Sequence, residues 1–191
     1  MTAMKKTILT AMVILAASGA SVAHAGERSL NVLLTGDMEA NSISIALSPD
    51  GHSYVIDSIG PLEVGGSVCA NPQGNPNEIV CEASTIAGFE VNAGAGDDSV
   101  VIAREVPVPV TLRGGPGNDR LVGGAGDDKL IGGIGNDVLV GRAGADWLYG
   151  GAGDDKLIGC SGDDLLRGGT GHNIYLGGTG TNDIAAGPGE G

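Results

Sequence analysis

The chain has 191 residues and a formal net charge of −13 at pH 7. Such an acidic surface repels nucleic acid and anionic membranes and favours cations, so nucleic-acid binding is excluded as a function. Aromatic residues make up 3% of the chain and glycine occurs 36 times. This composition leaves too little bulk for an ordinary globular core and favours a fold with small inward-facing residues.

Residues 1–25 have the features of a secretory signal peptide. Lys5 and Lys6 supply the positive first region, residues 8–17 form a short apolar segment, and residues 23–25 read Ala-His-Ala, a small-residue cleavage site. The apolar segment is shorter than the roughly 18 residues that a membrane span requires, which disfavours a membrane anchor. We expect cleavage behind this motif, no transmembrane span, and a secreted, extracellular or cell-surface location.

Residues 26–92 contain short alternating apolar runs separated by turn-forming residues, which predict β-strands and no helix. We expect this region to cap the fold that follows, because an exposed solenoid end needs covering. The alternative, in which these strands extend that fold irregularly, stays open.

Three cysteines are present, and two of them flank a loop rich in Pro, Asn and Gly. In an exported chain, Cys69 and Cys81 across residues 71–77 predict a disulfide bond. A metal site or a nucleophile is disfavoured, because the chain has no Cys-x-x-Cys and its histidines show no ligand spacing. Cys160 is left over, and we interpret it as a replacement for a glycine.

One nine-residue unit recurs without a gap from residue 114 to residue 185. The unit reads Gly-Gly-x-Gly-x-Asp, followed by any residue, an apolar residue and any residue; four of the eight copies match it fully and the others differ at position two or six. An isolated copy at residues 93–101 precedes them, separated by a 12-residue insertion at residues 102–113. Such a short fixed period predicts a solenoid. The eight contiguous copies begin at Gly114, Gly123, Gly132, Gly141, Gly150, Gly159, Gly168 and Gly177.

The unit has the chemistry of an oxygen cage. Glycines at positions one, two and four permit positive φ and leave room for an ion, while position six adds a carboxylate. Calcium prefers six to eight such oxygen ligands, whereas a phosphate site needs nearby cations. A disordered acidic linker is disfavoured because position eight is always apolar and predicts a core. The expected metal-binding residues are Asp98, Gly115, Gly117, Asp119, Gly124, Gly126, Asp128, Gly133, Gly135, Asp137, Gly144, Asp146, Gly151, Gly153, Asp155, Gly162 and Asp164.

This unit resembles the RTX, or haemolysin-type, calcium-binding repeat. The resemblance implies an all-β fold with a right-handed parallel β-roll over residues 93–191, in which two repeats make one turn and calcium lies between the loops of repeats i and i+2. Eight repeats then give four turns with two columns of calcium ions. The implied fully carboxylate-paired sites, about four in number, join Asp119 with Asp137, Asp137 with Asp155, Asp128 with Asp146, and Asp146 with Asp164.

Departures from the unit qualify this picture. Position six is Asn173 and Asn182 in the last two repeats, so we expect the sites there to be weak or empty. Arg142 and Cys160 replace the second glycine, where a side chain fits if φ is negative. Asp119 and Asp128 are expected to end their columns.

Position nine is apolar in most repeats and is expected to face outward. Ordinary β-propensity explains it, and the alternative is a surface for a protein or envelope partner. We therefore predict extracellular calcium binding with calcium-dependent folding, in a structural or interaction protein of the envelope or matrix. The alternative is an accessory or remnant of a secreted RTX enzyme or toxin. Catalysis is not expected, because His-Glu-x-x-His and Gly-x-Ser-x-Gly motifs are absent from the sequence.

Overall fold

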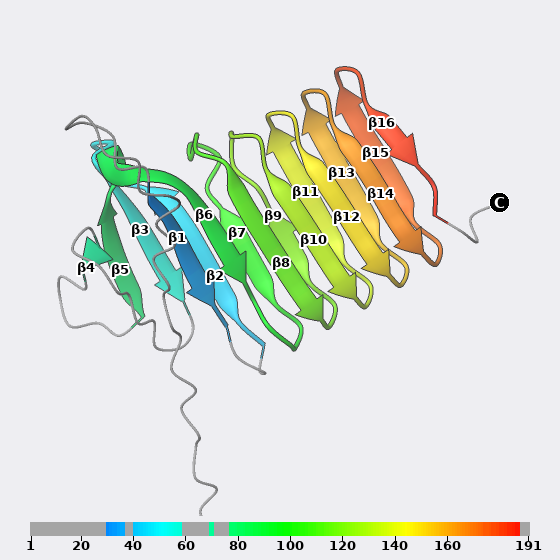
Figure 1. Cartoon of the computed structure of the whole chain (residues 1–191), viewed down its shortest axis with the longest axis horizontal. Helices are drawn as coiled ribbons and strands as arrows, with labels where there is room; N and C mark the ends of the chain where they lie inside the picture. Colours follow the sequence, from blue (N-terminus) through cyan, green and yellow to red (C-terminus); the bar gives the residue numbers. More distant parts are fainter. Residues whose placement is uncertain (1–29, 37–39, 59–68, 71–76, 188–191) are drawn as a thin grey trace, which may run out of the picture.

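The structure is a computed structural model that describes residues 30–36, 40–58, 69–70 and 77–187 (Figure 1). The predicted signal peptide lies outside these ranges. Within them, no helix is long and apolar enough to cross a membrane.

Two β-sheets make up the described fold. Sheet A consists, in spatial order, of β1 (Leu30–Thr35), β6 (Ile86–Asn92), β8 (Val110–Pro116), β10 (Lys129–Ile134), β12 (Trp147–Ala152), β14 (Leu165–Thr170) and β16 (Asp183–Ala185). Sheet B consists, in spatial order, of β15 (Ile174–Thr179), β13 (Lys156–Ser161), β11 (Val138–Ala143), β9 (Arg120–Val122), β7 (Ser99–Ile102), β2 (Ser42–Leu47), β3 (Ser53–Ser58), β5 (Glu78–Glu82) and β4 (Cys69–Ala70).

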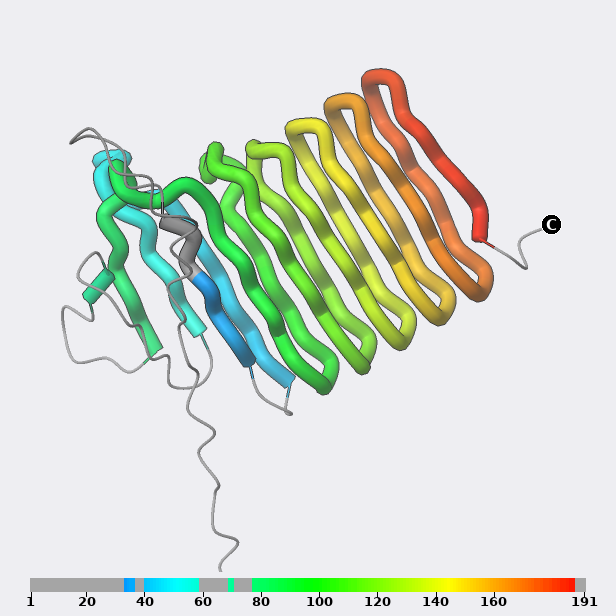
Figure 2. The backbone as a smooth tube through the Cα atoms, in the orientation of Figure 1, coloured from blue at the N-terminus to red at the C-terminus, as the bar shows by residue number. Residues whose placement is uncertain are grey.

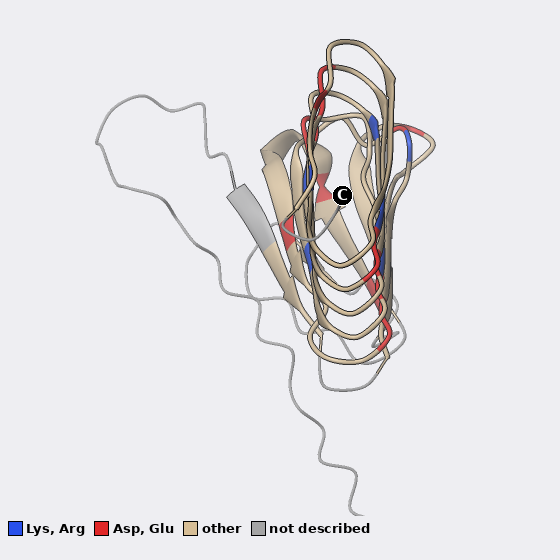
Figure 3. Cartoon of the chain, turned by 90° about the vertical axis from the view of Figure 1, so that its right-hand side faces the viewer, with Lys and Arg blue, Asp and Glu red and all other residues tan. Residues whose placement is uncertain are grey.

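From β6 onward the chain alternates between the two sheets and forms flattened, stacked coils (Figures 2 and 3). Neighbouring strands of the coils are parallel, and from β8 onward each paired residue lies 18 positions from its partner, as in Leu130 with Leu148, whereas β6 and β7 pair 21 positions on because of the insertion. The spacing of 18 is two repeats per turn. The all-β parallel β-roll predicted from the sequence is therefore confirmed, with about five turns rather than four.

The core between the sheets is a ladder of position-eight side chains. Leu121, Leu130, Leu139 and their counterparts up to Leu166 are completely buried, because each faces inward between its two outward neighbours. Most of the strands run for six residues and include the first glycines of the next repeat. Position nine is half-buried in most repeats, but Val122 is 2% exposed, contrary to expectation.

The described strands of the N-terminal region extend the two sheets of the roll. Strands β1 and β2 pair in parallel with β6 and β7, so they add one more coil to both sheets. Strands β3, β5 and β4 then continue sheet B in antiparallel order. The predicted disulfide between Cys69 and Cys81 is present and joins β4 to β5. One 3₁₀ turn, η1 (Ala83–Thr85), corrects the expectation of no helix, because the chain reverses there between β5 and β6.

Candidate functional site

The glycine loops stack in two columns at the two edges of the roll (Figure 2). At the first edge, loops lead from sheet A to sheet B; at the second edge, loops lead back. The first edge contains the position-six residues Asp98, Asp119, Asp137, Asp155 and Asn173, and the second contains Asp128, Asp146, Asp164 and Asn182. The structure therefore places the carboxylates of repeats i and i+2 in adjacent coils.

One oxygen of each position-six carboxylate closes a hydrogen bond between coils. The backbone N–H of Asp119 donates to Asp137 Oδ1 at 2.8 Å, and the N–H of Asp137 donates to Asp155 Oδ1 at 2.8 Å. At the second edge, the N–H of Asp128 donates to Asp146 Oδ1, and that of Asp146 to Asp164 Oδ1. These oxygens hold the stack together along both edges.

The second oxygen has a different environment. The Oδ2 atoms of Asp119, Asp137, Asp146 and Asp164 are buried and accept no hydrogen bond, although each residue is at most 2% exposed. A buried carboxylate oxygen without a partner is strongly unfavourable unless a cation or a proton reaches it. These four atoms therefore indicate where positive charge is required.

A backbone carbonyl oxygen converges on the same point as the unpaired oxygens of Asp119, Asp137 and Asp164. A Cβ atom added to Gly132 would overlap Asp137 Oδ2 and would lie 2.6 Å from the carbonyl oxygen of Gly150 in the next coil. Position one does not have the expected positive φ in these repeats. Glycine is required there because the two oxygens fill the space of a side chain.

Positions two and four do have the expected positive φ in most repeats. Gly133 and Gly135 have φ of 129° and 134°, and added Cβ atoms there would overlap the carbonyl oxygens of Gly115 and Gly117. Loop carbonyls thus point along the stack toward the next coil. The same positive φ occurs at these predicted residues: Gly115, Gly117, Gly133, Gly135, Gly144, Gly151, Gly153 and Gly162.

The loop of the second repeat differs from the others. Neither Gly124 nor Gly126 has positive φ, because this loop packs against the backbone of Val106 and Val108 in the insertion. Asp128 Oδ2 accepts a hydrogen bond from the N–H of Gly124 at 2.6 Å. Its Oδ1 accepts one from the N–H of Val110 at 2.9 Å. Backbone donors therefore satisfy both oxygens of this carboxylate.

The first-edge column is longer than the sequence indicated. The N–H of Asp98 donates to Asp119 Oδ1, so Asp119 does not end its column. The N–H of Asn41 in turn donates to Asp98 Oδ1 at 2.6 Å. Sequence reasoning missed Asn41; the signal was Gly36, Asn41 and Ile43 at positions one, six and eight of a degenerate repeat.

A second ladder at position five was also missed. The N–H groups of Asn118, Asn136, Asp154 and His172 each donate to the position-five oxygen of the preceding coil, beginning with Asp97. This ladder runs opposite to the position-six ladder and lies at the exposed rim. The side chains of Asp and Asn at position five therefore have a structural role as hydrogen-bond acceptors, in addition to the charge that Asp contributes.

The last repeats and the two replaced glycines complete the picture. Asn173 Oδ1 and Asn182 Oδ1 accept N–H donors as aspartate does, but their Nδ2 atoms lie toward position one. A nitrogen donor repels a cation.

Arg142 and Cys160 have φ of 85° and 82°, so the expectation of negative φ was wrong. Both follow the glycine conformation because the coil pairing imposes it.

Burial controls the protonation of these carboxylates. Burial raises the pKa of Asp146 to about 7 and those of Asp128 and Asp137 to about 6, with opposing backbone hydrogen bonds and smaller repulsion from neighbouring carboxylates. Within the described residues, no three His, Cys, Asp or Glu side chains form a metal-binding cluster. At each edge, each coil supplies one position-six carboxylate, so a cation bound there requires backbone carbonyl oxygens as well.

A parallel β-roll whose stacked glycine loops collect carboxylate and carbonyl oxygens defines a class of repeat protein that binds hard cations such as calcium. The comparison with family models identifies the particular family. The model of the RTX calcium-binding nonapeptide repeat, which contains four copies, matches residues 111–139, 131–159 and 149–184. Residues 111–184 of this chain therefore carry RTX calcium-binding repeats. No curated protein and no solved structure matched the chain.

Proposed function

We propose that this protein is an extracellular calcium-binding protein whose roll folds when calcium binds. The observation that supports it most is the set of unpaired, buried Oδ2 atoms, three of which, those of Asp119, Asp137 and Asp164, lie beside a backbone carbonyl oxygen. Hard oxygen donors of mixed carboxylate and carbonyl type match the ligands that calcium prefers.

Asp119, Asp137, Asp146 and Asp164 are the carboxylates that we expect to hold calcium, with carbonyl oxygens of positions one, two and four. Asp98 and Asp155 continue the first-edge column and are expected to take part. Asp128 differs, because its two oxygens already accept backbone hydrogen bonds. We expect Gly124, Gly126 and Asp128 to contribute least among the residues that the sequence predicted.

Calcium-dependent folding follows from electrostatics. Without a cation, each column stacks buried carboxylates in adjacent coils, and their desolvation opposes folding. A cation bound only in the folded state adds its binding free energy to stability. Export directed by the predicted signal peptide, residues 1–25, would bring the chain to millimolar external calcium, and this calcium would fold the roll.

The role that we propose is structural or interactive rather than catalytic, as a calcium-stiffened element of the envelope or matrix. Its support is architectural: the described residues from β6 to β16 are almost entirely roll, stacked in nearest-neighbour coils. A partner of unknown identity would bind the outward-facing residues of the sheets.

A calcium titration followed by circular dichroism tests the proposal. We expect β-signal to appear cooperatively with calcium and poorly with magnesium, which demands tighter octahedral geometry. A roll that is equally folded in chelator would contradict calcium-dependent folding. The absence of any heat of binding when calcium is titrated in a calorimeter would contradict calcium binding itself. Intact-mass analysis of exported protein tests the predicted start at Gly26.

A further inference from the structure

Within the strands of the roll from β6 to β16, acidic residues occur on sheet A alone. The strands β7, β9, β11, β13 and β15 of sheet B contain no Asp or Glu but include Arg120, Arg142 and Lys156. On sheet A, in contrast, Arg113 pairs with Glu90, Arg167 pairs with Asp183, and Lys129 lies over the ring of Tyr149. These five strands of sheet B therefore present positive charge that no acidic residue on them neutralises, on a chain whose formal charge is −13.

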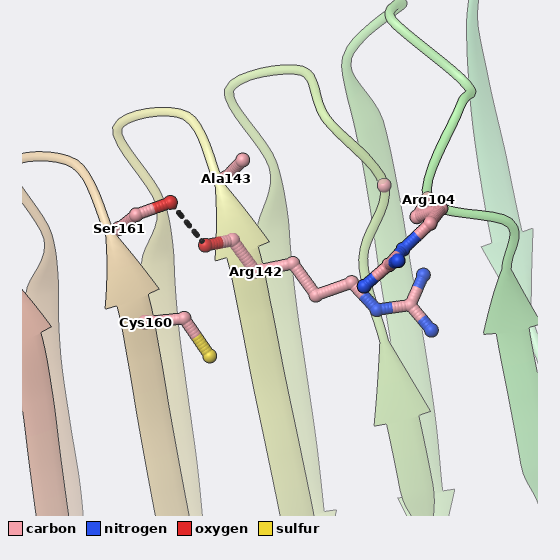
Figure 4. A pocket seen from close by; sticks show the side chains of 6 residues that line it. Arg104, Arg142, Ala143, Cys160 and Ser161 are labelled. Atoms are coloured by element: carbon pink, nitrogen blue, oxygen red, sulfur yellow. Dashed lines mark hydrogen bonds between the residues drawn. The ribbon is translucent and has the colours of Figure 1, made fainter.

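A pocket lies where this basic face meets the second edge. It has a volume of about 410 Å³ and is lined by Arg104, Gly124, Arg142, Ala143, Cys160 and Ser161. Figure 4 shows the guanidinium groups of Arg104 and Arg142 side by side, with the Cys160 side chain on the same side of the strands. Among the described residues, neither arginine forms an ion pair with a carboxylate.

Arg142 is held rigidly in this pocket. Its Nη1 donates to the carbonyl oxygens of Ile102 at 2.5 Å and of Gly123 at 3.0 Å. These carbonyls end strand β7 and follow strand β9, where the insertion interrupts the pairing of sheet B. Because a guanidinium has five N–H donors in a fixed plane, these two hydrogen bonds orient the group and leave donors for a ligand.

The pocket gathers like charges that a ligand could neutralise. Burial lowers the pKa of Arg142, and repulsion from Arg104 and Arg120 lowers it further, while Glu105 opposes this with the smallest effect. Two adjacent guanidinium groups match the geometry of a carboxylate, sulfate or phosphate, which accepts paired N–H donors. The volume also falls in the range of small-ligand pockets.

We propose that the Arg104–Arg142 pocket binds an oxyanion, namely a carboxylate, sulfate or phosphate group, and that this face is the anion-binding face of the protein. The same chemistry serves a free anion or a group carried on an acidic polymer lying along Arg120 and Lys156. This site is separate from the calcium columns, which attract the opposite charge.

Cys160 provides the readout, because it lines the pocket and its thiol is free, whereas Cys69 and Cys81 are bonded to each other. Alkylation rates with iodoacetate, an anion, and with neutral iodoacetamide are compared in the calcium-loaded full chain. The ratio of the two rates cancels effects on thiol exposure and ionisation. We expect Arg104→Gln to lower this ratio at least about threefold, since one guanidinium beside the reagent is lost.

Arg113→Gln is the matched control, because it removes the same charge from sheet A and is expected to keep the wild-type ratio. Sodium sulfate should slow iodoacetate more than sodium chloride of equal ionic strength. If the ligand is a polymer, dextran sulfate should slow the iodoacetate reaction at a lower concentration of sulfate groups than free sulfate does, and neutral dextran should have no effect. If the ligand is a free anion, dextran sulfate and free sulfate should be equally potent. Equal ratios in the two variants, no specific effect of either sulfate probe, or a thiol unreactive toward both reagents would overturn the proposal.

Discussion

Replacing Asp146 with asparagine should change stability in opposite directions with and without calcium. The substitution keeps an Oδ1 acceptor for the N–H of Asp128, at 2.8 Å in the wild type. It replaces the unpaired Oδ2 by an amide nitrogen, the arrangement already present at Asn182. The variant therefore removes the charge and leaves the ladder hydrogen bond in place.

The magnitude follows from the burial of the carboxylate. Burial raises the pKa of Asp146 from 3.8 to about 7, and each unit corresponds to about 1.4 kcal/mol. Since water at the loop edge screens part of this cost, we expect Asp146→Asn to stabilise the calcium-free roll by about 2 kcal/mol at pH 8. With saturating calcium the sign reverses, because a buried cation loses a charged partner, with an expected loss of about 3 kcal/mol.

Circular dichroism measures both effects. In chelator, the roll is folded by titrating trimethylamine N-oxide, and the midpoint should be lower for Asp146→Asn than for the wild type. In calcium, urea unfolding should show a lower midpoint for the variant. Asp146→Ala should lose about 1–3 kcal/mol more in both conditions, because the buried N–H of Asp128 then has no acceptor.

Asp127→Asn is the matched control at the same edge. Its Oδ1 also accepts a backbone N–H, from Ala145 at 2.8 Å, but the residue is exposed. We expect changes within about 0.5 kcal/mol in both conditions. Destabilisation by Asp146→Asn in chelator would refute the unpaired-oxygen argument, and stabilisation in saturating calcium would show that Asp146 holds no calcium.

Four further predictions concern the rest of the roll. In chelator with enough trimethylamine N-oxide to fold the roll, the free energy of unfolding should fall as pH rises from about 4 to about 7, because burial raises the pKa values of Asp128 and Asp137 to about 6 and that of Asp146 to about 7, above the 3.8 of the unfolded chain, so the folded state binds more protons; thermal scans showing a rise would contradict this. Gly132→Ala should weaken calcium binding at least about tenfold by titration, since the added carbon overlaps Asp137 Oδ2. Replacing Cys69 and Cys81 with serine should destabilise the cap by about 3 kcal/mol in urea unfolding, because their separation is only 12 residues and the closed loop is short. Cys160→Gly should raise stability by about 1 kcal/mol by relieving positive φ, whereas Arg142→Gly should show no such gain because two hydrogen bonds are lost; equal gains in thermal unfolding would refute the role of those bonds.

The sequence by itself determined the repeating part of this protein. In a solenoid each coil contacts only its neighbours, so the same contacts recur at a multiple of the nine-residue period. The inward row from Leu121 to Leu166 and the glycine conformations at positions two and four follow from that period, while the resemblance to the RTX repeat implied the i to i+18 spacing and the two columns of aspartates. The disulfide between Cys69 and Cys81 was also predictable, because it closes a short local loop.

Tertiary structure alone decided the places where the repeat is interrupted. Asn41 reaches Asp98 across 57 positions, and Arg142 reaches Ile102 across 40. The degenerate repeat that contains Asn41 marks it as a position-six residue, but only the pairing of the coils brings it to Asp98, and no local pattern specifies the contact of Arg142. The insertion also turns Gly124 toward Asp128, although the sequence of that repeat matches the consensus. Position one needs glycine because an oxygen from the next coil fills its side-chain space, and that oxygen is placed only when the coils stack.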